Sequence, residues 1–494
     1  MERELKLQVL QGEAWETVLS HPLVDLATVA PRPMHALYFD TSDRRLQRAG
    51  IAYRLRREGE QWVATLKFAG AAGGGLHQRP EWNVAVAEPQ ADLGVFSDPE
   101  LTEILRPYRD LPLTVVLETV FERRERRLTE VGGEQWLLAA DRGEIRVKEE
   151  VLPILELELE LVTGTVASLL ERGAALCEAL PLCPESQSKF QRGIALQLAQ
   201  LPTSSVQTRQ EIQTPKLHGR EDAADALRGI LIGEIQESLT ALRVDTRDGS
   251  RTSFHDLRRA VRQLRALLRF CKPLEVDAGL KKPRQELATW FHQQSGRRDR
   301  DALLDHWQSH APEFQLAPGL LTEALLKSDT ETPSSAGTLA ATLLRLWAQL
   351  EGATALSGRL SLREFAEQQL AQMDRKLRRA HIDAVSAEDR AEFHRLRIQI
   401  KNFRYVLQRL AGLWPAKDSK GMMKLLGHLQ ESSGLIRDAQ MSASHLQPLG
   451  HEAPSELALH AGVLWGYLVA RMQREEKKFR KSWNRFLEAS RPWD

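Results

Sequence analysis

The segment Glu2-Arg3-Glu4-Leu5-Lys6-Leu7-Gln8-Val9 decides the fold of the first part of the chain, because charged and apolar residues alternate along it. Successive side chains of a β-strand point to opposite faces of the sheet, so the alternation predicts a strand with one charged face. The same pattern recurs in further segments: Ile51 to Arg57, Trp62 to Lys67, Glu81 to Val86, Leu113 to Phe121 and Ile154 to Leu161. We expect these segments to form an antiparallel sheet.

The charged face of these strands is unusual, because Glu, Lys and Arg recur on nearly every one of them. If the strands close into a barrel, these carboxylates and cations line one pore. Carboxylates bind hard divalent ions, and Arg and Lys hold phosphates, so the set of residues predicts a metal-assisted phosphoanhydride hydrolase. The alternative is a solvated sheet face stabilised by cross-strand pairs of Glu and Lys.

The second part of the chain has a period of 3.6 and reads as helices from Arg220 to the C-terminus, apart from a loop around Ser328 to Ser335. A short helical stretch, Thr165 to Leu198, ends the first part. The segment from Leu201 to Gly219 is rich in Thr, Ser, Gln and Pro without a clear period, which favours a linker. We therefore expect a domain at 1–200, a linker at 201–218 and a helical domain at 219–494.

An internal repeat with an offset of 139 residues runs through the helical part. It relates four residues, His255, Arg258, Arg262 and Arg265, to His394, Arg397, Lys401 and Arg404, and it relates Arg298-Asp299 to Arg437-Asp438. Apolar residues form a core-facing stripe in each copy, and the basic residues form a second stripe about 100° around the helix. Two such rows of cations facing a shared cleft would bind a polyanion. The alternative is a solvated or salt-bridged helix face.

Composition limits the other possibilities. The 494 residues contain 68 Lys and Arg and 67 Asp and Glu, so the net charge of +1 excludes a general polycation. Three cysteines, Cys177, Cys183 and Cys271, match neither a disulfide framework nor a zinc site, and we expect a cytoplasmic protein. No apolar stretch is long enough to predict a membrane span. Walker-type, His-Glu-x-x-His and Gly-x-Ser-x-Gly motifs are absent from the sequence.

An ordered series of motifs connects these observations to known families. The series is Glu2-x-Glu4-x-Lys6, Tyr38-Phe39-Asp40-Thr41, Arg54-x-Arg56, Lys67, Arg79-Pro80-Glu81, Asp141 and Glu156-x-Glu158-x-Glu160. In this order the motifs resemble the triphosphate tunnel metalloenzyme (CYTH) family. The helical part, with its two His-x-x-Arg stripes and two Arg-Asp elements, resembles the conserved-histidine α-helical (CHAD) domain.

The resemblance implies an α+β multidomain protein. Its N-terminal antiparallel eight-stranded β tunnel would hydrolyse inorganic triphosphate to diphosphate and phosphate, with Mg²⁺ or Mn²⁺ as cofactor. Its all-α domain, with an internal two-fold repeat, would bind polyphosphate. The same tunnel also admits thiamine-triphosphatase and class IV adenylyl cyclase activities, and a non-enzymatic polyphosphate-binding scaffold is a further alternative. Nucleic acid is a weaker candidate, because no aromatic residues interleave the cation stripes.

The resemblance also implies roles for particular residues. The metal ligands would be Glu2, Glu4, Glu81, Asp141, Glu156 and Glu158, and the catalytic residues Glu2, Glu4, Lys6, Glu156 and Glu158. Substrate phosphates would contact Lys6, Arg54, Arg56, Lys67, Arg79, Arg124, Arg126 and Lys189, with Arg192 beside Lys189 in a related element. Alternation alone cannot choose the register within 122–127, where four arginines occur, and Arg124 and Arg126 are the expectation. Polyphosphate would bind His255, Arg258, Arg262, Arg265, His394, Arg397, Lys401 and Arg404.

Overall fold

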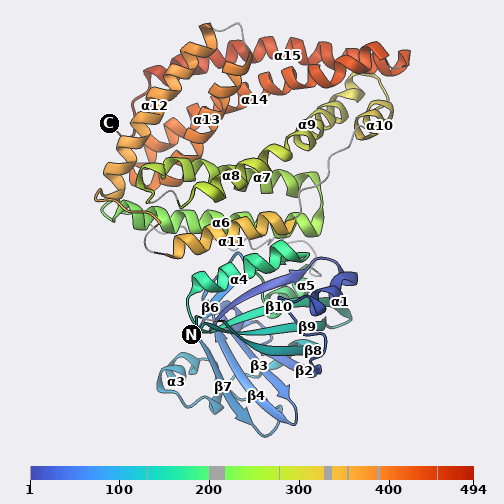
Figure 1. Ribbon diagram of the computed structural model, residues 1–494, viewed down its shortest axis with the longest axis vertical. Coiled ribbons are helices and arrows are strands. Elements are labelled where there is room, and N and C mark those ends of the chain that lie inside the picture. Colours follow the sequence, from blue (N-terminus) through green and yellow to red (C-terminus); the bar gives the residue numbers. More distant parts are fainter. Residues whose placement is uncertain are drawn as a thin grey trace. The chain divides into compact units, whose positions relative to one another are not determined.

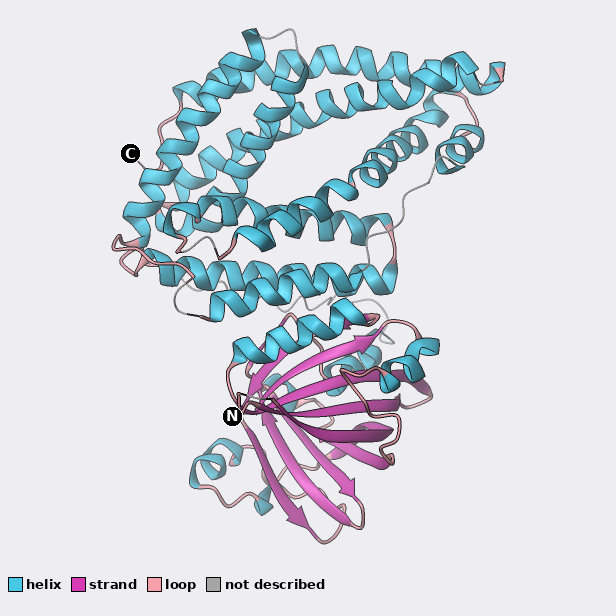
Figure 2. Cartoon of the chain, in the orientation of Figure 1, coloured by secondary structure: helices cyan, strands magenta, loops and turns pink. Residues whose placement is uncertain are grey.

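The computed structural model describes residues 2–130, 132–199, 217–276, 279–327, 336–352, 355–386, 390–452 and 454–493. The expected linker lies outside these ranges except for its last two residues, and so does the expected loop from Ser328 to Ser335. The described residues form a sheet-containing part and a helical part, as predicted (Figure 2). Two compact units are present, and α6 is divided between them at Ile235. The expected domain boundaries remain a prediction.

All strands of the described residues belong to one antiparallel sheet. Their bounds are β1 (Glu2–Val9), β2 (Arg32–Asp40), β3 (Ile51–Glu58), β4 (Gln61–Phe68), β5 (Ala71–Gly73), β6 (Leu76–Arg79), β7 (Glu81–Val86), β8 (Thr114–Thr129), β9 (Gln135–Val147), β10 (Glu150–Thr163) and β11 (Leu182–Pro184). The order is β5-β6-β1-β10-β9-β8-β2-β3-β4-β7, and β11 pairs with β1. The sheet is strongly curled (Figure 1).

The curl of the sheet is visible in its pairing, because Pro80 alone separates β6 from β7. Strand β6 pairs with β1 and β7 pairs with β4, so one extended segment joins both sides of the sheet. Proline has no N–H to donate to a strand ladder, which explains the break. The sheet has eleven strands, whereas eight were expected. The excess consists of the three-residue strands β5 and β11 and the division of one segment at Pro80.

The compact unit that contains the sheet also contains the five α-helices of residues 2–199, the second part of α6, and α11. These helices are α1 (Trp15–Ser20), α2 (Arg45–Arg48), α3 (Pro99–Leu105), α4 (Val166–Ala179), α5 (Lys189–Ala199), α6 (Ala223–Asp248) and α11 (Ala336–Glu351). Helix α4 begins with a capping box between Thr165 and Ser168 and packs on β1 and β10. A Cβ at Gly173 of α4 would lie 2.1 Å from Leu5, so only glycine allows this approach. Helix α11, almost entirely apolar, packs on α4.

One end of the curled sheet holds an apolar cluster. It includes Met34, Tyr38, Leu117 and Phe121 from the strands, and Ile194 from α5 packs into it. Helix α5 therefore closes this end of the sheet with apolar residues, while its first turn carries Lys189 and Arg192.

The other compact unit consists of helices and the first part of α6. Its helices are α7 (Arg251–Phe270), α8 (Lys281–Gln293), α9 (Ser295–His310), α10 (Gly319–Lys327), α12 (Leu362–Ser386), α13 (Arg390–Leu410), α14 (Ala416–Glu452) and α15 (Ser455–Glu488). Helices α14 and α15 form a long antiparallel pair, and α13 packs on both α7 and α14. The helical character from Arg220 onward is confirmed for the described residues, and the internal two-fold repeat remains a prediction. None of the described helices combines the length and apolar character that a bilayer crossing requires.

Candidate active site

The register of the strands decides which side chains share the inner face of the curled sheet. Directly opposite residues of an antiparallel pair lie on the same face. In the pairing of β1 with β10, Lys6 lies opposite Glu158 and Gln8 lies opposite Glu156. The leucines between these residues are buried on the other face, where α4 packs. The alternation read from the sequence therefore separates a charged inner face from an apolar outer face.

Three buried carboxylates form an acidic cluster on the inner face, contributed by Asp141 of β9 and by Glu156 and Glu158 of β10. One oxygen from each lies within 4.8 Å of the others. Lys189 Nζ donates to Asp141 Oδ2 at 2.7 Å and to Glu158 Oε1 at 3.0 Å, and it also contacts Glu156. Arg123 donates two hydrogen bonds of 2.7 Å to Asp141 and a third to Glu158. Cations thus balance the buried negative charge.

The glutamates of the acidic cluster stay ionised in spite of burial. Burial raises the pKa of Glu156, but the nearby charges of Arg192 and Lys189 lower it overall. In the same way Lys189 and Lys6 hold the pKa of Glu158 well below its ordinary value. Ionised carboxylates in a set of three are the ligands that a hard divalent cation takes.

A second group of charges lies at the β1, β4, β6 and β7 strands. Lys67 Nζ lies 2.9 Å from Glu2 Oε1 and 2.6 Å from Glu81 Oε2. Arg79 Nη2 donates to Glu4 Oε1 at 2.9 Å. Burial raises the pKa of Glu81, but Lys67 and other partners bring it to about 2. The group supplies three more carboxylates, each already paired with a cation.

Lys6 connects these two sets of carboxylates. Its Nζ lies 3.1 Å from Glu4 Oε2 and also donates to Glu158. Burial lowers the pKa of Lys6, but Glu158 and Glu4 raise it above its ordinary value. Lys6 is therefore a fixed positive charge between the acidic cluster and the second group.

Positive charge is crowded beside the second group. Burial and the neighbouring Arg54 lower the pKa of Arg56 to about 10. Burial, Arg54 and Arg79 also lower the pKa of Lys67. Tyr38 hydrogen-bonds to Arg54 and, although burial raises its pKa, Arg54 lowers it overall. Cations that lower the pKa of a neighbouring cation favour binding of an anion.

The structure brings most of the expected site residues together on this face. They are Glu2, Glu4, Lys6, Arg54, Arg56, Lys67, Arg79, Glu81, Asp141, Glu156, Glu158 and Lys189. Arg192 joins them through its contact with Glu156.

Arg124 and Arg126 are the exceptions, because both lie on the outer side of β8. Arg124 Nη1 donates to backbone carbonyl oxygens within 26–29, the shortest bond being 2.6 Å, and Arg126 contacts Asp25. The arginine that reaches the acidic cluster is Arg123. The prediction that Arg124 and Arg126 face the site is therefore wrong by one residue.

Three further residues at the site were missed as functional candidates. Arg123 was hidden in the arginine run, and Tyr38 was noted only as part of a motif. His77 lies opposite Glu4 and is 2% exposed, and burial and Lys6 lower its pKa to about 4. A single histidine in a short strand gives no pattern from which this position could be inferred.

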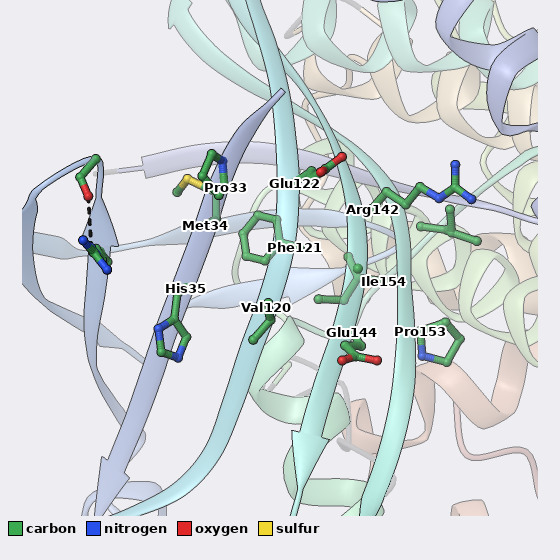
Figure 3. Close-up of a pocket in the computed structure, with 14 residues that line it drawn as sticks. Pro33, Met34, His35, Val120, Phe121, Glu122, Arg142, Glu144, Pro153 and Ile154 are labelled. Carbon is green, nitrogen blue, oxygen red and sulfur yellow. Dashed lines mark hydrogen bonds between the residues drawn. The ribbon is translucent and has the colours of Figure 1, made fainter. Parts of the chain in front are cut away.

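A cavity of about 820 Å³ lies elsewhere on the sheet and contains none of the carboxylates of the acidic cluster (Figure 3). Its labelled side chains include His35, Val120, Glu122 and Glu144, which alternate along the strands with inward residues such as Phe121. The lining also includes Met34, Phe121 and Ile154 of the apolar cluster, and it contains none of the charged residues named above for the inner site.

The cation stripe of α7 surrounds one aromatic ring of α8. The guanidinium carbons of Arg258, Arg262 and Arg265 lie 4.2, 5.1 and 4.8 Å from the ring centroid of Phe291. Burial, together with Arg269 and Arg262, lowers the pKa of Arg265 to about 10. His255, the first residue of the stripe, is exposed. Positive charge is therefore concentrated around this ring.

The corresponding stripe of α13 is partly buried. Arg397 and Lys401 are 6% and 8% exposed, and His394 Nδ1 accepts a hydrogen bond of 2.6 Å from Arg437. The Nε of Arg404 is buried and has no hydrogen-bond partner within the described part of the chain. The side chains of Arg298 and Asp299, expected to match 437–438, lie outside the described residues.

Comparison with known proteins defines the class to which this architecture belongs. Residues 1–194 match the model of the CYTH domain, and residues 231–447 match the model of the CHAD domain. The matches place a CYTH domain at 1–194 and a CHAD domain at 231–447, the two domains that the motifs predicted.

Among curated proteins, an inorganic triphosphatase of Haemophilus influenzae is 31% identical over 196 residues, which are 39% of this chain and 52% of that protein. The chain thus matches about half the length of this relative. Among solved structures, the CHAD domain of Ricinus communis is 21% identical, with a TM-score of 0.45 over 57% of this chain and 96% of that one. A Hippeastrum protein reported to have a dominant triphosphatase activity is 21% identical, with a TM-score of 0.29 over 40% of this chain and 96% of that one.

Proposed function

We propose that the curled sheet encloses a tunnel in which inorganic triphosphate is hydrolysed to diphosphate and phosphate. The observation that carries the proposal is the juxtaposition of buried, ionised carboxylates with crowded cations on one face. Arg56 and Lys67, whose pKa values are lowered by neighbouring positive charge, suit an anion. A linear chain of phosphates would contact several such cations at once.

The donor set fits a hard divalent ion such as Mg²⁺ or Mn²⁺. Such ions prefer oxygen ligands, and the acidic cluster offers one oxygen from each of Asp141, Glu156 and Glu158 within 4.8 Å. Glu2, Glu4 and Glu81 are further candidate ligands. A bound divalent ion would neutralise phosphate oxygens and lower the pKa of a bound water.

The protein side chains would bind and orient the substrate. Arg54, Arg56, Lys67 and Arg79 are placed to hold phosphate oxygens beside the second group of carboxylates. Lys6 and Lys189, both charged and buried among carboxylates, would hold phosphate oxygens beside the carboxylates that would bind the metal. Fixed cations in a site that excludes water stabilise the charge on the leaving diphosphate.

We further propose that the helical domain binds polyphosphate. Arg258, Arg262 and Arg265 share one aromatic ring, and burial, together with Arg269 and Arg262, lowers the pKa of Arg265. Bound phosphates would offset the positive charge gathered there. The α7 and α13 helices pack together, which supports a common site for the two stripes related by the proposed repeat. The buried free cysteines support a reducing cytoplasm as the location.

The experiment that tests the hydrolase is phosphate release from inorganic triphosphate, thiamine triphosphate and ATP, each with Mg²⁺, with Mn²⁺ and with a chelator. Metal-dependent release from inorganic triphosphate alone is the expected result. Preference for thiamine triphosphate, or formation of cyclic AMP from ATP, would move the proposal to those activities. If no substrate reacts while polyphosphate still binds, the protein is a scaffold.

A further inference from the structure

Glu185 connects several parts of the inner site. It follows β11, precedes α5 and is 5% exposed. Its backbone N–H donates to the carbonyl oxygen of Lys6 at 2.9 Å, and its own carbonyl oxygen lies 3.2 Å from His77 Nε2. Its carboxylate accepts a bond of 2.9 Å from the backbone N–H of Gln187. Glu185 therefore holds the Lys6 backbone and the start of α5.

The cation that pairs with Glu185 comes from far along the sequence. Arg243 of α6 donates through Nε to Glu185 Oε2 at 2.9 Å. Both side chains are largely shielded from water, with exposed fractions of 19% and 6%. Arg243 lies within the residues matched by the CHAD model, yet it belongs to the same compact unit as the sheet.

Helix α6 also supports the other side of Lys6. The N–H of Lys6 donates to the carbonyl oxygen of Gly75 at 2.9 Å, in the turn between β5 and β6. This turn lies directly on α6, because a Cβ at Gly73 or Gly74 would come within 2.8 Å of Gln236 or Leu239. Both backbone partners of Lys6 are therefore in segments that α6 contacts.

Removal of Arg243 would leave Glu185 as a buried, unpaired carboxylate. An alternative cation is Arg192, which now donates to Glu156. Burial lowers the pKa of Arg192, but Glu156 and then Glu185 raise it, so the Glu185 charge acts on it already. An uncompensated Glu185 would compete with the acidic cluster for Arg192.

We propose that Arg243 is a positioning residue of the hydrolytic site, which by pairing with Glu185 fixes the Lys6 backbone and keeps Arg192 on Glu156. The inference rests on the proposed triphosphatase activity. It assigns to α6, a helix after the linker, a part in the site that lies on the sheet.

The test uses four variants of the full chain: Arg243→Met, Arg243→Lys, Glu185→Gln, and Arg243→Met combined with Glu185→Gln. Arg243→Met is expected to lower kcat for triphosphate at least tenfold with little change in KM, because Arg243 does not touch the substrate. Glu185→Gln removes the competing charge and keeps an acceptor for Gln187. The double variant should therefore recover most of kcat, and Arg243→Lys should lie near wild type.

Arg345→Met is the matched control. Arg345 pairs with Glu178 and so joins α11 to α4 in the same compact unit. Its kcat should stay within about twofold of wild type.

Amide hydrogen exchange gives a readout that does not depend on hydrolysis. Arg243→Met should speed exchange in α5 and at Lys6, and the double variant should restore protection. Equal impairment of the single and double variants would show that Arg243 acts by packing alone, and an unchanged Arg243→Met would also overturn the inference. If wild type fails to hydrolyse triphosphate, the proposed function falls, while the exchange data still decide the positioning role.

Discussion

Arg123→Met should lower the stability of the protein, and added divalent metal should restore part of the loss. The stability lost in Arg124→Met should not depend on the metal. Arg123 holds Asp141 by two hydrogen bonds of 2.7 Å and also binds Glu158, and its side chain is 13% exposed. Removal of one partner from a buried pair costs about 3–5 kcal/mol. For a compact unit of this size the loss corresponds to roughly 6–20 °C in Tm.

The metal dependence separates the two variants. Without Arg123 the acidic cluster lacks a compensating charge, and a divalent ion at a concentration of 100 Kd would return about 2.7 kcal/mol. Arg124 instead donates to neutral carbonyl oxygens of an outer loop, so its loss should cost about 1.5–3 kcal/mol whether or not metal is present. The kcat/KM of Arg124→Met should stay within about threefold of wild type. Arg123→Met should lower kcat/KM at least a hundredfold, which is the usual effect of losing one preorganised hydrogen-bond donor from an active site.

The assay is thermal unfolding in a chelator and in Mn²⁺, followed by triphosphate turnover. The reasoning predicts a large metal-induced rise in Tm for Arg123→Met and equal rises for Arg124→Met and wild type. If Arg124→Met showed the larger metal response and the larger loss of turnover, the register of β8 on the inner face would be wrong.

Three further predictions follow from other parts of the structure. Glu4→Ala should abolish triphosphate hydrolysis without weakening polyphosphate retention, and Arg262→Glu combined with Lys401→Glu should do the reverse; loss of both properties in either variant would contradict separate sites. Burial and Lys6 lower the pKa of His77 to about 4, so its neutral form contributes stability that is complete above about pH 6.5 and is lost as the pH falls towards 4. Between pH 7 and pH 4, the free energy of unfolding measured with urea should therefore fall by about 3 kcal/mol less in His77→Gln than in wild type. An equal fall in both proteins would show that His77 is not the cause. Gly143→Ala should strongly destabilise the sheet, because its Cβ would lie 2.2 Å from the carbonyl oxygen of Val120, whereas Gly132→Ala, with no atom within 4 Å, should leave Tm unchanged; similar Tm values for the two variants would refute the close approach.

The sequence predicted the curled sheet and most of its inner face because one period, two residues, encodes both strand and face. The prediction of inward residues failed where the two-residue period does not distinguish the two faces of the sheet. Within 122–127 arginines occur at both odd and even positions, so only the pairing of Arg123 with Asp141 of β9 decides the register. The number of strands was missed because β5 and β11 have three residues each and β6 has four, too few to show a clear alternation.

Long-range partners are the other part that periodicity could not supply. Arg243 and Glu185 are 58 residues apart, and α6 has no charge pattern that points to β11. The sequence gives only a weak indication that α11 belongs to the sheet-containing unit. Residues 336–351 contain only one basic and one acidic residue, and a helix with so few charges is usually buried. The partner that buries it could not be read from the segment itself.

The charge balance of the inner face bears on how its ligands would bind. Eight carboxylates, of Glu2, Glu4, Glu58, Glu81, Asp141, Glu156, Glu158 and Glu160, face eight cations, of Lys6, Arg54, Arg56, Lys67, Arg79, Arg123, Lys189 and Arg192. A divalent ion alone would add unbalanced positive charge to this set, and triphosphate alone would add unbalanced negative charge. Each ligand therefore lowers the cost of the other, and linkage requires the effect to be reciprocal. Calorimetry should find tighter Mn²⁺ binding in the presence of diphosphate and tighter diphosphate binding with Mn²⁺, by the same factor; independent affinities would mean that the paired charges on this face do not rearrange around the ligands.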